Sequence, residues 1–321
     1  MVIFYVIFAI IIIVLISGYF LLKSKINIYY PTRKDACAIM SSPTYLSQLN
    51  NNDIIARELN NTNLKDVYCD NVLSISMSER RALVWIITLL QLRLGNISML
   101  NDWSFIKINK KIENGLPHTR SNVIILPNII FKQLLKYHNN KLENKALVTI
   151  GGLLIHEKTH VLQKQHPKLF YDLYVNYWNF IKANRIIGDK LFRKQIRTNP
   201  DGLDVSWIFH QNHQYIWIVS LFNGNHNLHQ VEYVGIYVNP INLEEKIFKI
   251  INPTKKIDLM KIPEFSNFFV GINSNYYHPN ELSAEIFTQY YLNSMKLDSI
   301  NMKSPAIIKF LEWHRVNNLK N

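Results

Sequence analysis

The sequence predicts an α+β fold preceded by one N-terminal transmembrane helix, and three observations lead to this prediction. Residues 1–22 carry no charged side chain, and an apolar run of this length can cross a bilayer as a helix. Segments 78–94 and 147–164 repeat apolar residues at helical spacing. Between residues 215 and 238, two runs of β-branched and aromatic residues flank Asn223-Gly224-Asn225, which is typical of a β-hairpin.

The N-terminal apolar run favours an uncleaved anchor over a signal peptide. A signal peptide would have a basic start, a shorter apolar stretch and a small-residue cleavage site, and none of these is evident. Lys23, Lys25, Arg33 and Lys34 follow the run, so the positive-inside rule places the rest of the chain on the cytoplasmic side. In a lumenal domain, the sequons that begin at Asn60 and Asn96 could instead be glycosylated.

The remaining chain divides into a turn-rich linker or entry segment, 23–70, and one folded domain, 71–321. The domain has three short predicted motifs besides its helices and hairpin: strands at 103–108 and 122–127, and a turn at 197–202. Further helices are expected at 129–138, 169–187, 281–296 and from 304 to 313. Cys37 and Cys69 are interpreted as two ordinary thiols, although one bridge could form in an oxidising compartment.

The most informative motif is His156-Glu157-Lys158-Thr159-His160. On a helix, positions i and i+4 share one face, so both imidazoles can reach one ion with Glu157 beside them. The surrounding residues are apolar, and a buried helix with two histidines and a glutamate needs polar partners or a metal. This motif predicts two zinc ligands and a general base, and such a site needs one more protein ligand.

Two residues compete for the third ligand position. Glu281 lies in the first turn of the helix expected after Pro279, and Glu285 shares its face one turn later. His166 follows His160 by six positions, but reaching back to the ion would require a helix break where the chain has Gln163. The helix-face argument favours Glu281 and leaves His166 as the alternative.

Together the two motifs resemble those of the zincin metallopeptidases, in particular the gluzincin branch, with Asn280-Glu281-Leu282-Ser283-Ala284-Glu285 as the second motif. The resemblance implies a zincin-like catalytic domain with His156, His160 and Glu281 as Zn²⁺ ligands and Glu157 as the base. Glu285 would hold a liganding histidine, although an aspartate is more usual at this place. The two motifs are roughly 120 residues apart, so about 168–275 would be an insertion that contains the β-hairpin.

The resemblance also raises two questions that the sequence leaves open. Strand 122–127 would be either the sheet edge that pairs with an extended substrate or a plain core strand. A cationic or hydroxyl donor should stabilise the tetrahedral oxyanion, and Tyr276, Tyr277 and His278 are nearest in sequence to the third ligand.

The sequence therefore predicts a membrane-anchored zinc metallopeptidase that acts on polypeptides. The alternative is a catalytically silent, membrane-tethered module that uses the same scaffold for binding or assembly. The net charge of +13 could hold the domain against an anionic membrane surface. No specific nucleic-acid partner is expected, because no nucleic-acid-binding motif accompanies the basic clusters.

Overall fold

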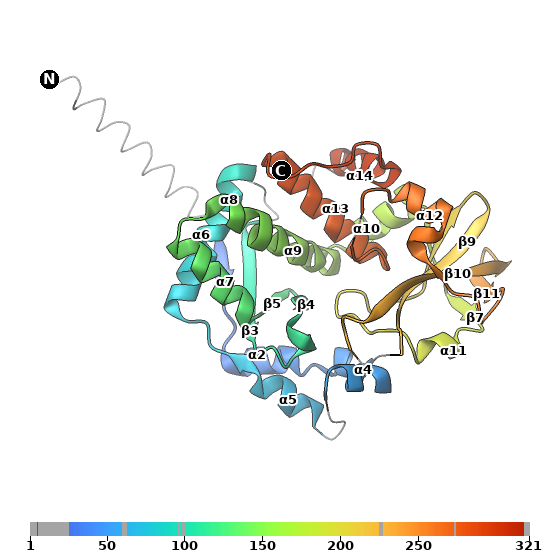
Figure 1. Ribbon diagram of the computed structural model, residues 1–321, viewed down its shortest axis with the longest axis horizontal. Coiled ribbons are helices and arrows are strands. Elements are labelled where there is room, and N and C mark those ends of the chain that lie inside the picture. Colours follow the sequence, from blue (N-terminus) through green and yellow to red (C-terminus); the bar gives the residue numbers. More distant parts are fainter. Residues whose placement is uncertain are drawn as a thin grey trace.

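A computed structural model of the chain describes Tyr5 and residues 26–59, 63–95, 97, 100–224, 227–272 and 274–317. It has two β-sheets, and helices occur in both the N-terminal and the C-terminal half of the chain (Figure 1). This arrangement confirms the predicted α+β class. Apart from Tyr5, the apolar run 1–22 lies outside the described residues. Within the described residues, no helix combines the length and apolar character needed to cross a membrane.

The N-terminal half contains the first sheet and the helices that cover it. Its strands are β1 (Asn27–Tyr29), β2 (Val72–Leu73), β3 (Asp102–Ile108), β4 (His118–Arg120) and β5 (Val123–Pro127). Its helices are α2 (Arg33–Met40), α3 (Pro43–Leu46), α4 (Asn51–Ala56), α5 (Leu64–Asp70), α6 (Met77–Leu94), η2 (Glu113–Gly115), α7 (Asn128–Asn139), α8 (Glu143–Ala146), the π-helical turn η3 (Leu147–Gly151) and α9 (Gly152–Gln165).

The first sheet has the strand order β1-β3-β5-β4, with β2 paired to β3. β1, β3 and β5 are parallel, whereas β4 runs antiparallel to β5 and forms the edge. Side chains alternate between the two faces of the sheet. Phe105 and Ile124 join the core under α6, α7 and α9, while Ile106 and Ile125 join a second core under α2 and α5. The sheet is therefore covered on both faces.

The described part of segment 23–70 is not the irregular entry segment that the sequence predicted. It forms β1 and helices α2 to α5, and its residues Ala36, Met40 and Tyr68 are buried in the second core of the first sheet. Asn50, one of the residues that suggested a turn, forms a capping box with Asp53 at the start of α4. This segment belongs to the folded domain.

The C-terminal half contains the second sheet. Its strands are β6 (Phe180–Lys182), β7 (Arg185–Ile187), β8 (Trp207–Gln211), β9 (Gln214–Phe222), β10 (Val231–Asn242), β11 (Ile247–Ile250) and β12 (Ile257–Asp258). Its helices are α10 (Pro167–Asp172), the π-helical turn η4 (Leu173–Tyr177), α11 (Lys190–Arg193), η5 (Leu259–Lys261), α12 (Pro263–Phe268), α13 (Pro279–Ser294) and α14 (Pro305–Val316). The predicted hairpin is confirmed as β9 and β10.

The second sheet has the order β6-β8-β9-β10-β11-β7, with β12 paired to β10. A single helix over 169–187 was predicted, and this is wrong beyond Tyr177. Trp178 ends the helical segment, Asn179 adopts a positive φ of 58°, and β6 and β7 follow. The aromatic side chains that suggested a helix pack in the core on both sides of this break.

Helices α9 and α13 lie side by side between the two sheets (Figure 1). They approach closely at Gly152, where an added Cβ would lie 3.5 Å from side-chain atoms of Thr288 and Leu292. A larger side chain at this position would push the helices apart. Gly152 therefore lies at the contact between the two motif-bearing helices, where a single methyl group would still fit.

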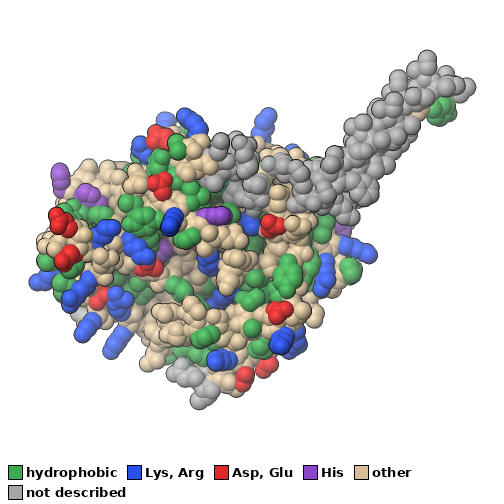
Figure 2. All heavy atoms as spheres, turned by 180° about the vertical axis from the view of Figure 1, so that it is seen from behind, with side chains coloured by type: hydrophobic (Ala, Val, Ile, Leu, Met, Phe, Trp, Pro, Cys, Tyr) green, Lys and Arg blue, Asp and Glu red, His purple; other side chains and the backbone are tan. Residues whose placement is uncertain are grey.

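The face of the molecule shown in Figure 2 has basic side chains distributed over it and interspersed with acidic and apolar ones. Exposed ion pairs of the protein include Lys309 with Glu312 and Lys256 with Glu232. Exposed pairs of this kind contribute little to stability.

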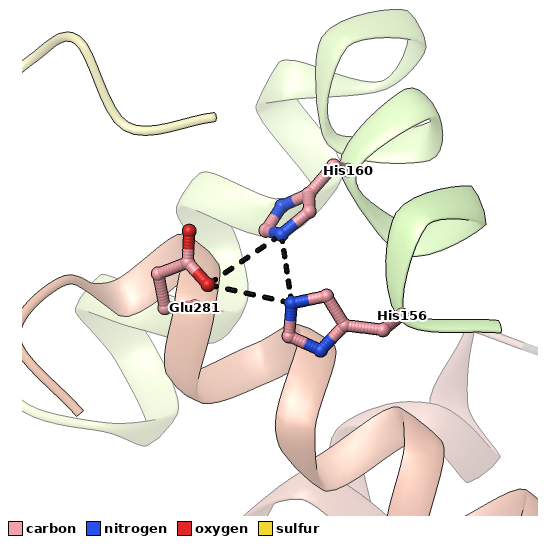
Figure 3. Close-up of side chains that lie close together, drawn as sticks. All are labelled: His156, His160 and Glu281. Carbon is pink, nitrogen blue, oxygen red and sulfur yellow. Dashed lines mark hydrogen bonds and ion pairs between the residues drawn. The ribbon is translucent and has the colours of Figure 1, made fainter. Parts of the chain in front are cut away.

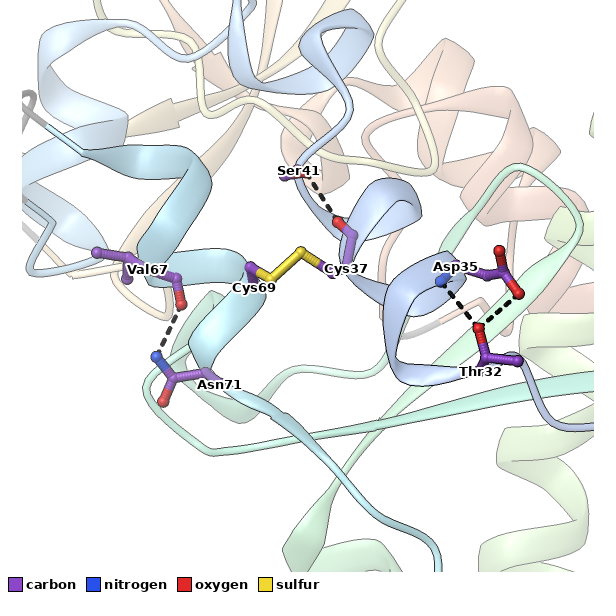
Figure 4. The surroundings of a disulfide bond; sticks show 7 residues. All are labelled: Thr32, Asp35, Cys37, Ser41, Val67, Cys69 and Asn71. Atoms are coloured by element: carbon purple, nitrogen blue, oxygen red, sulfur yellow. Dashed lines mark hydrogen bonds between the residues drawn. A yellow bond between two sulfur atoms is a disulfide. The ribbon is translucent and has the colours of Figure 1, made fainter.

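Cys37 of α2 and Cys69 of α5 form a disulfide bond (Figure 4), so the interpretation of two ordinary thiols is wrong. α2 and α5 pack on the same face of the first sheet and bring the two Cα atoms to 4.5 Å. Disulfides persist in oxidising compartments. The bond therefore argues against the cytoplasmic placement that the charges flanking the anchor predict.

Replacing both cysteines with serine should lower the free energy of unfolding by about 3 to 4 kcal/mol, because the bond closes a loop with a sequence separation of 32 residues. Urea unfolding followed by tryptophan fluorescence would measure the change. Reductant should destabilise the unmodified chain by a similar amount and leave the double variant unaffected. Equal stability of the two chains would contradict the prediction.

Candidate metal centre

The two histidines of the sequence motif project from one face of α9 (Figure 3). Their spacing of one helical turn brings His156 Nε2 to 3.1 Å from His160 Nε2. His160 is almost fully buried and His156 is partly buried. Glu157, between them in sequence, is also buried, and its Oε2 atom has no hydrogen-bond partner among the described residues.

The third member of the cluster comes from the first turn of α13. His278 caps this helix by accepting a hydrogen bond from Asn280 N, and Pro279 occupies the first helical position. Glu281 follows, with its Oε2 atom 3.4 Å from His156 Nε2 and 3.6 Å from His160 Nε2 (Figure 3). The structure therefore brings together the three residues that the sequence favoured as ligands.

The three ligand atoms have the separations that a small tetrahedral ion requires. Zinc binds histidine nitrogen and carboxylate oxygen at about 2.0 to 2.2 Å, so ligands of a tetrahedron lie roughly 3.3 to 3.6 Å apart. Two of the observed edges, 3.4 and 3.6 Å, fall in this range, and the third, 3.1 Å, is slightly shorter. The chemistry of the donors, two imidazoles and one carboxylate, also suits Zn²⁺.

The electrostatics of the cluster favour a bound cation. Burial alone would lower the pKa of His160, but Asp201 and Glu281 outweigh it and raise this pKa to about 10. Burial, followed by repulsion from Asp201, raises the pKa of Glu157 to about 7. The three buried carboxylates thus create a negative potential that a divalent ion would neutralise.

Gln163, one turn after His160, orients this histidine. His160 Nδ1 donates to Gln163 Oε1 at 2.9 Å, which leaves Nε2 free to bind a metal. Gln163 Nε2 in turn donates to Asn280 O at 2.8 Å and to Ser283 Oγ at 2.7 Å. In the sequence, Gln163 was only a reason to expect no helix break. In the structure it connects α9 to α13.

The resemblance assigned that orienting role to Glu285, but in the structure Glu285 contacts neither histidine. It lines the same cavity, but its Oε1 accepts a hydrogen bond from Gln289 at 3.3 Å, and no described contact joins it to His156 or His160. His166, the alternative third ligand, is exposed at the C-terminal end of α9 and is not part of the cluster.

Among the three oxyanion candidates, only Tyr277 directs its polar group toward the cluster. Its hydroxyl accepts hydrogen bonds from Arg197 Nη2 at 2.7 Å and Asn199 Nδ2 at 2.5 Å. His278 uses both ring nitrogens, one on Asn280 N and the other on Asp204 O. The Tyr276 ring packs against Tyr233 and Phe265.

The strand at 122–127 is not the edge of its sheet, because β5 lies between β3 and β4. The edge is β4, whose Thr119 directs its backbone N–H and C=O away from β5. Asp201 accepts from Thr119 N at 3.1 Å, and Lys164 Nζ donates to Thr119 O at 3.0 Å. Asp201 and Lys164 also form an ion pair at 2.9 Å.

The sequence predicted residues 197–202 only as a turn. In the structure this turn contacts Glu281 of the His156–His160–Glu281 cluster. Asn199 Nδ2 lies 2.5 Å from Glu281 Oε1, and Asn280 Nδ2 donates to Asp201 O at 2.7 Å. Gly202 allows this close approach, since an added Cβ would lie 3.0 Å from the ring of His278. The turn thereby connects β4, α9 and α13.

A network of buried ion pairs contacts this turn through Thr198. Arg57 pairs with Asp53 and Glu113, both at 2.8 Å, and Arg120 pairs with Glu113 at 3.2 Å. Burial would raise the pKa of Glu113, but the two arginines outweigh it and lower this pKa to about 2. Arg57 also donates to Thr198 O and so links the network to the turn.

Together these elements enclose a cavity of about 360 Å³ that includes the metal cluster. His156, Glu157, His160 and Glu281 line one side, and the turn 197–201 lines the other. Arg197, Asn199 and Asp201 were not predicted as site residues. The only signal was a turn motif, which specifies backbone shape and not location in the fold.

No model of a protein family matches the sequence, and neither a curated protein nor a solved structure is detectably similar to it. The function of the chain therefore has to be inferred from its own residues and their geometry.

Glu281→Ala should abolish stoichiometric zinc binding, because two imidazoles alone leave the ion with too few protein ligands. Metal analysis after dialysis against zinc would show this. His166→Ala is the matched control and should retain zinc. Zinc loss from the control alone would show that the third ligand is His166.

Gln163→Ala should weaken zinc binding by about tenfold to a hundredfold, because His160 would lose the acceptor that orients its ring. Competition with a chromogenic chelator would measure the affinity. Gln165→Ala changes an exposed glutamine on the same helix and should leave the affinity unaltered. An equal loss in both variants would exclude an orienting role for Gln163.

Proposed function

We propose that this protein is a membrane-anchored zinc metallopeptidase with a zincin-like catalytic domain. The observation that carries the proposal is the triangle formed by His156, His160 and Glu281, with the buried carboxylate of Glu157 beside it in the same cavity. Two helices supply the ligands, as in the gluzincin branch that the sequence resembles. Residues 1–22 would form the anchor.

Zinc held by this triangle would supply a Lewis acid that polarises the scissile carbonyl and acidifies water. Glu157 would take a proton from the attacking water and transfer it to the leaving amine nitrogen. Burial, followed by repulsion from Asp201, raises the pKa of Glu157 and so favours proton acceptance by its carboxylate.

Tyr277 is the residue that we assign to oxyanion stabilisation. Its hydroxyl accepts from Arg197 and Asn199, so its own proton can be donated to a substrate oxygen. Burial, only partly offset by Arg197, holds the pKa of Tyr277 well above its usual range, which keeps the group protonated. Arg197 would strengthen the hydroxyl as a donor.

The alternative, a catalytically silent binding module, is favoured by one observation. An extended peptide would pair with the edge strand β4 through Thr119, but Asp201 and Lys164 already occupy its backbone groups. A peptidase would have to displace Asp201 to use this edge. A catalytically silent module would not have to displace Asp201.

Glu157→Gln separates the two functions. In the full-length chain it should retain zinc and lose peptide hydrolysis by at least about a thousandfold, because the amide cannot accept the proton. Mass spectrometry of a peptide library would detect cleavage. Glu143→Gln, at an exposed position on α8, is the matched control and should cleave normally. If neither the unmodified chain nor the control cleaves any peptide, the silent module is correct.

A further inference from the structure

The cavity at the metal centre contains one cationic side chain with no acidic partner among the described residues. Arg197 lines the cavity beside Tyr277 and Asn199. Its contacts are with neutral groups: the Tyr277 hydroxyl at 2.7 Å and Leu228 O at 3.2 Å. Its Nε atom is buried and has no hydrogen-bond partner within the described part of the chain. The guanidinium carbon also lies 5.0 Å from the centre of the Tyr277 ring.

The other cations that line or border the cavity have acidic partners. Arg57 and Arg120 are matched by Asp53 and Glu113, with which they form buried ion pairs. Lys164 is matched by Asp201 in the same way.

Three further carboxylates line the cavity. Glu157 and Glu281 lie at the metal triangle, where a divalent ion would offset their charges, and Glu285 accepts a hydrogen bond from the neutral Gln289. Arg197 is thus the lining cation with no ion-pair partner among the described residues, because Glu281 acts on it only at a distance. A buried guanidinium with no acidic group in contact favours a ligand that supplies that charge.

The arginine is also close to the reacting groups. Tyr277 accepts hydrogen bonds from both Arg197 and Asn199, and Asn199 contacts the ligand Glu281 at 2.5 Å. The guanidinium is therefore separated from the metal triangle by a single shell of side chains. An anionic group bound there would belong to a residue next to the bond that is cleaved.

We propose that Arg197 is a substrate-binding residue that recognises a carboxylate next to the scissile bond. The substrates of this site would then be peptides that carry such a carboxylate. An arginine suits this task, because its planar donors match the geometry of a carboxylate. This inference rests on the proposed peptidase function and specifies its substrate class.

The carboxylate could come from the C-terminus of a short peptide or from an aspartate or glutamate side chain. Three sets of N-acetylated tetrapeptides distinguish these sources: neutral sequences with a free C-terminus, the same sequences amidated, and amidated sequences with one acidic residue. Binding is measured by equilibrium dialysis against the zinc-loaded, full-length chain with Glu157→Gln, so that no peptide is consumed.

With Arg197 in place, at least one carboxylate-bearing set should bind about tenfold to a hundredfold more tightly than the amidated neutral set. The set that gains identifies the source of the carboxylate. Arg197→Met should reduce the preference to about one, and Arg197→Lys should retain part of it because the charge remains. Arg193→Met, which removes an exposed arginine four residues earlier, is the matched control and should keep the full preference.

Equal binding of the three sets would overturn the proposal, as would an undiminished preference in a folded Arg197→Met chain. Circular dichroism would establish the folding of each variant, and Arg197→Lys provides the test if the methionine variant does not fold. The experiment needs no turnover. A carboxylate preference can therefore be found even if the unmodified chain cleaves no peptide, and the two proposals can fail separately.

Discussion

The packing of α9 against α13 is the constraint on which the candidate site depends. Three ligand atoms within 3.1 to 3.6 Å of one another require two helices from distant parts of the chain to hold a fixed relative rotation. The two helices meet at Gly152, and Gln163 fixes their register by contacting Asn280 and Ser283 on the other helix. The same side chain orients His160, so the helix contact and the ligand geometry are coupled.

The turn at 197–202 supplies polar and charged side chains to the candidate site. It contributes Arg197, Asn199 and Asp201 to a cavity whose other side is the metal cluster. Asp201 and Lys164 also occupy the backbone groups of the edge strand, so the turn lies where an extended peptide would pair. The buried pairs of Arg57 and Arg120 with Asp53 and Glu113 hold the turn from below, because removing one partner would leave a buried charge uncompensated.

Much of the secondary structure could be predicted, because apolar periodicity reports which face of an element is buried. α6, β3, β5, α9, the β9–β10 hairpin and α13 lie within a few residues of their predicted positions. Segment 169–187 was misjudged because its aromatic residues keep a helical spacing beyond the point where Asn179 turns the chain. The Cys37–Cys69 bond and the order of strands in the first sheet depend on long-range pairing, which periodicity does not encode.

The sequence by itself determined that His156, Glu157 and His160 share one helix face and that Glu281 begins a second helix. These relations are local, since residues within one or two turns have a fixed geometry once the helix forms. Only the tertiary structure decided that Glu281 and not His166 completes the triangle, and that Gln163 and not Glu285 holds His160. It also placed Tyr277, but not Tyr276 or His278, among the described residues that line the cavity, together with Arg197. Those contacts join segments roughly 80 to 120 residues apart, and their geometry depends on how the whole core packs.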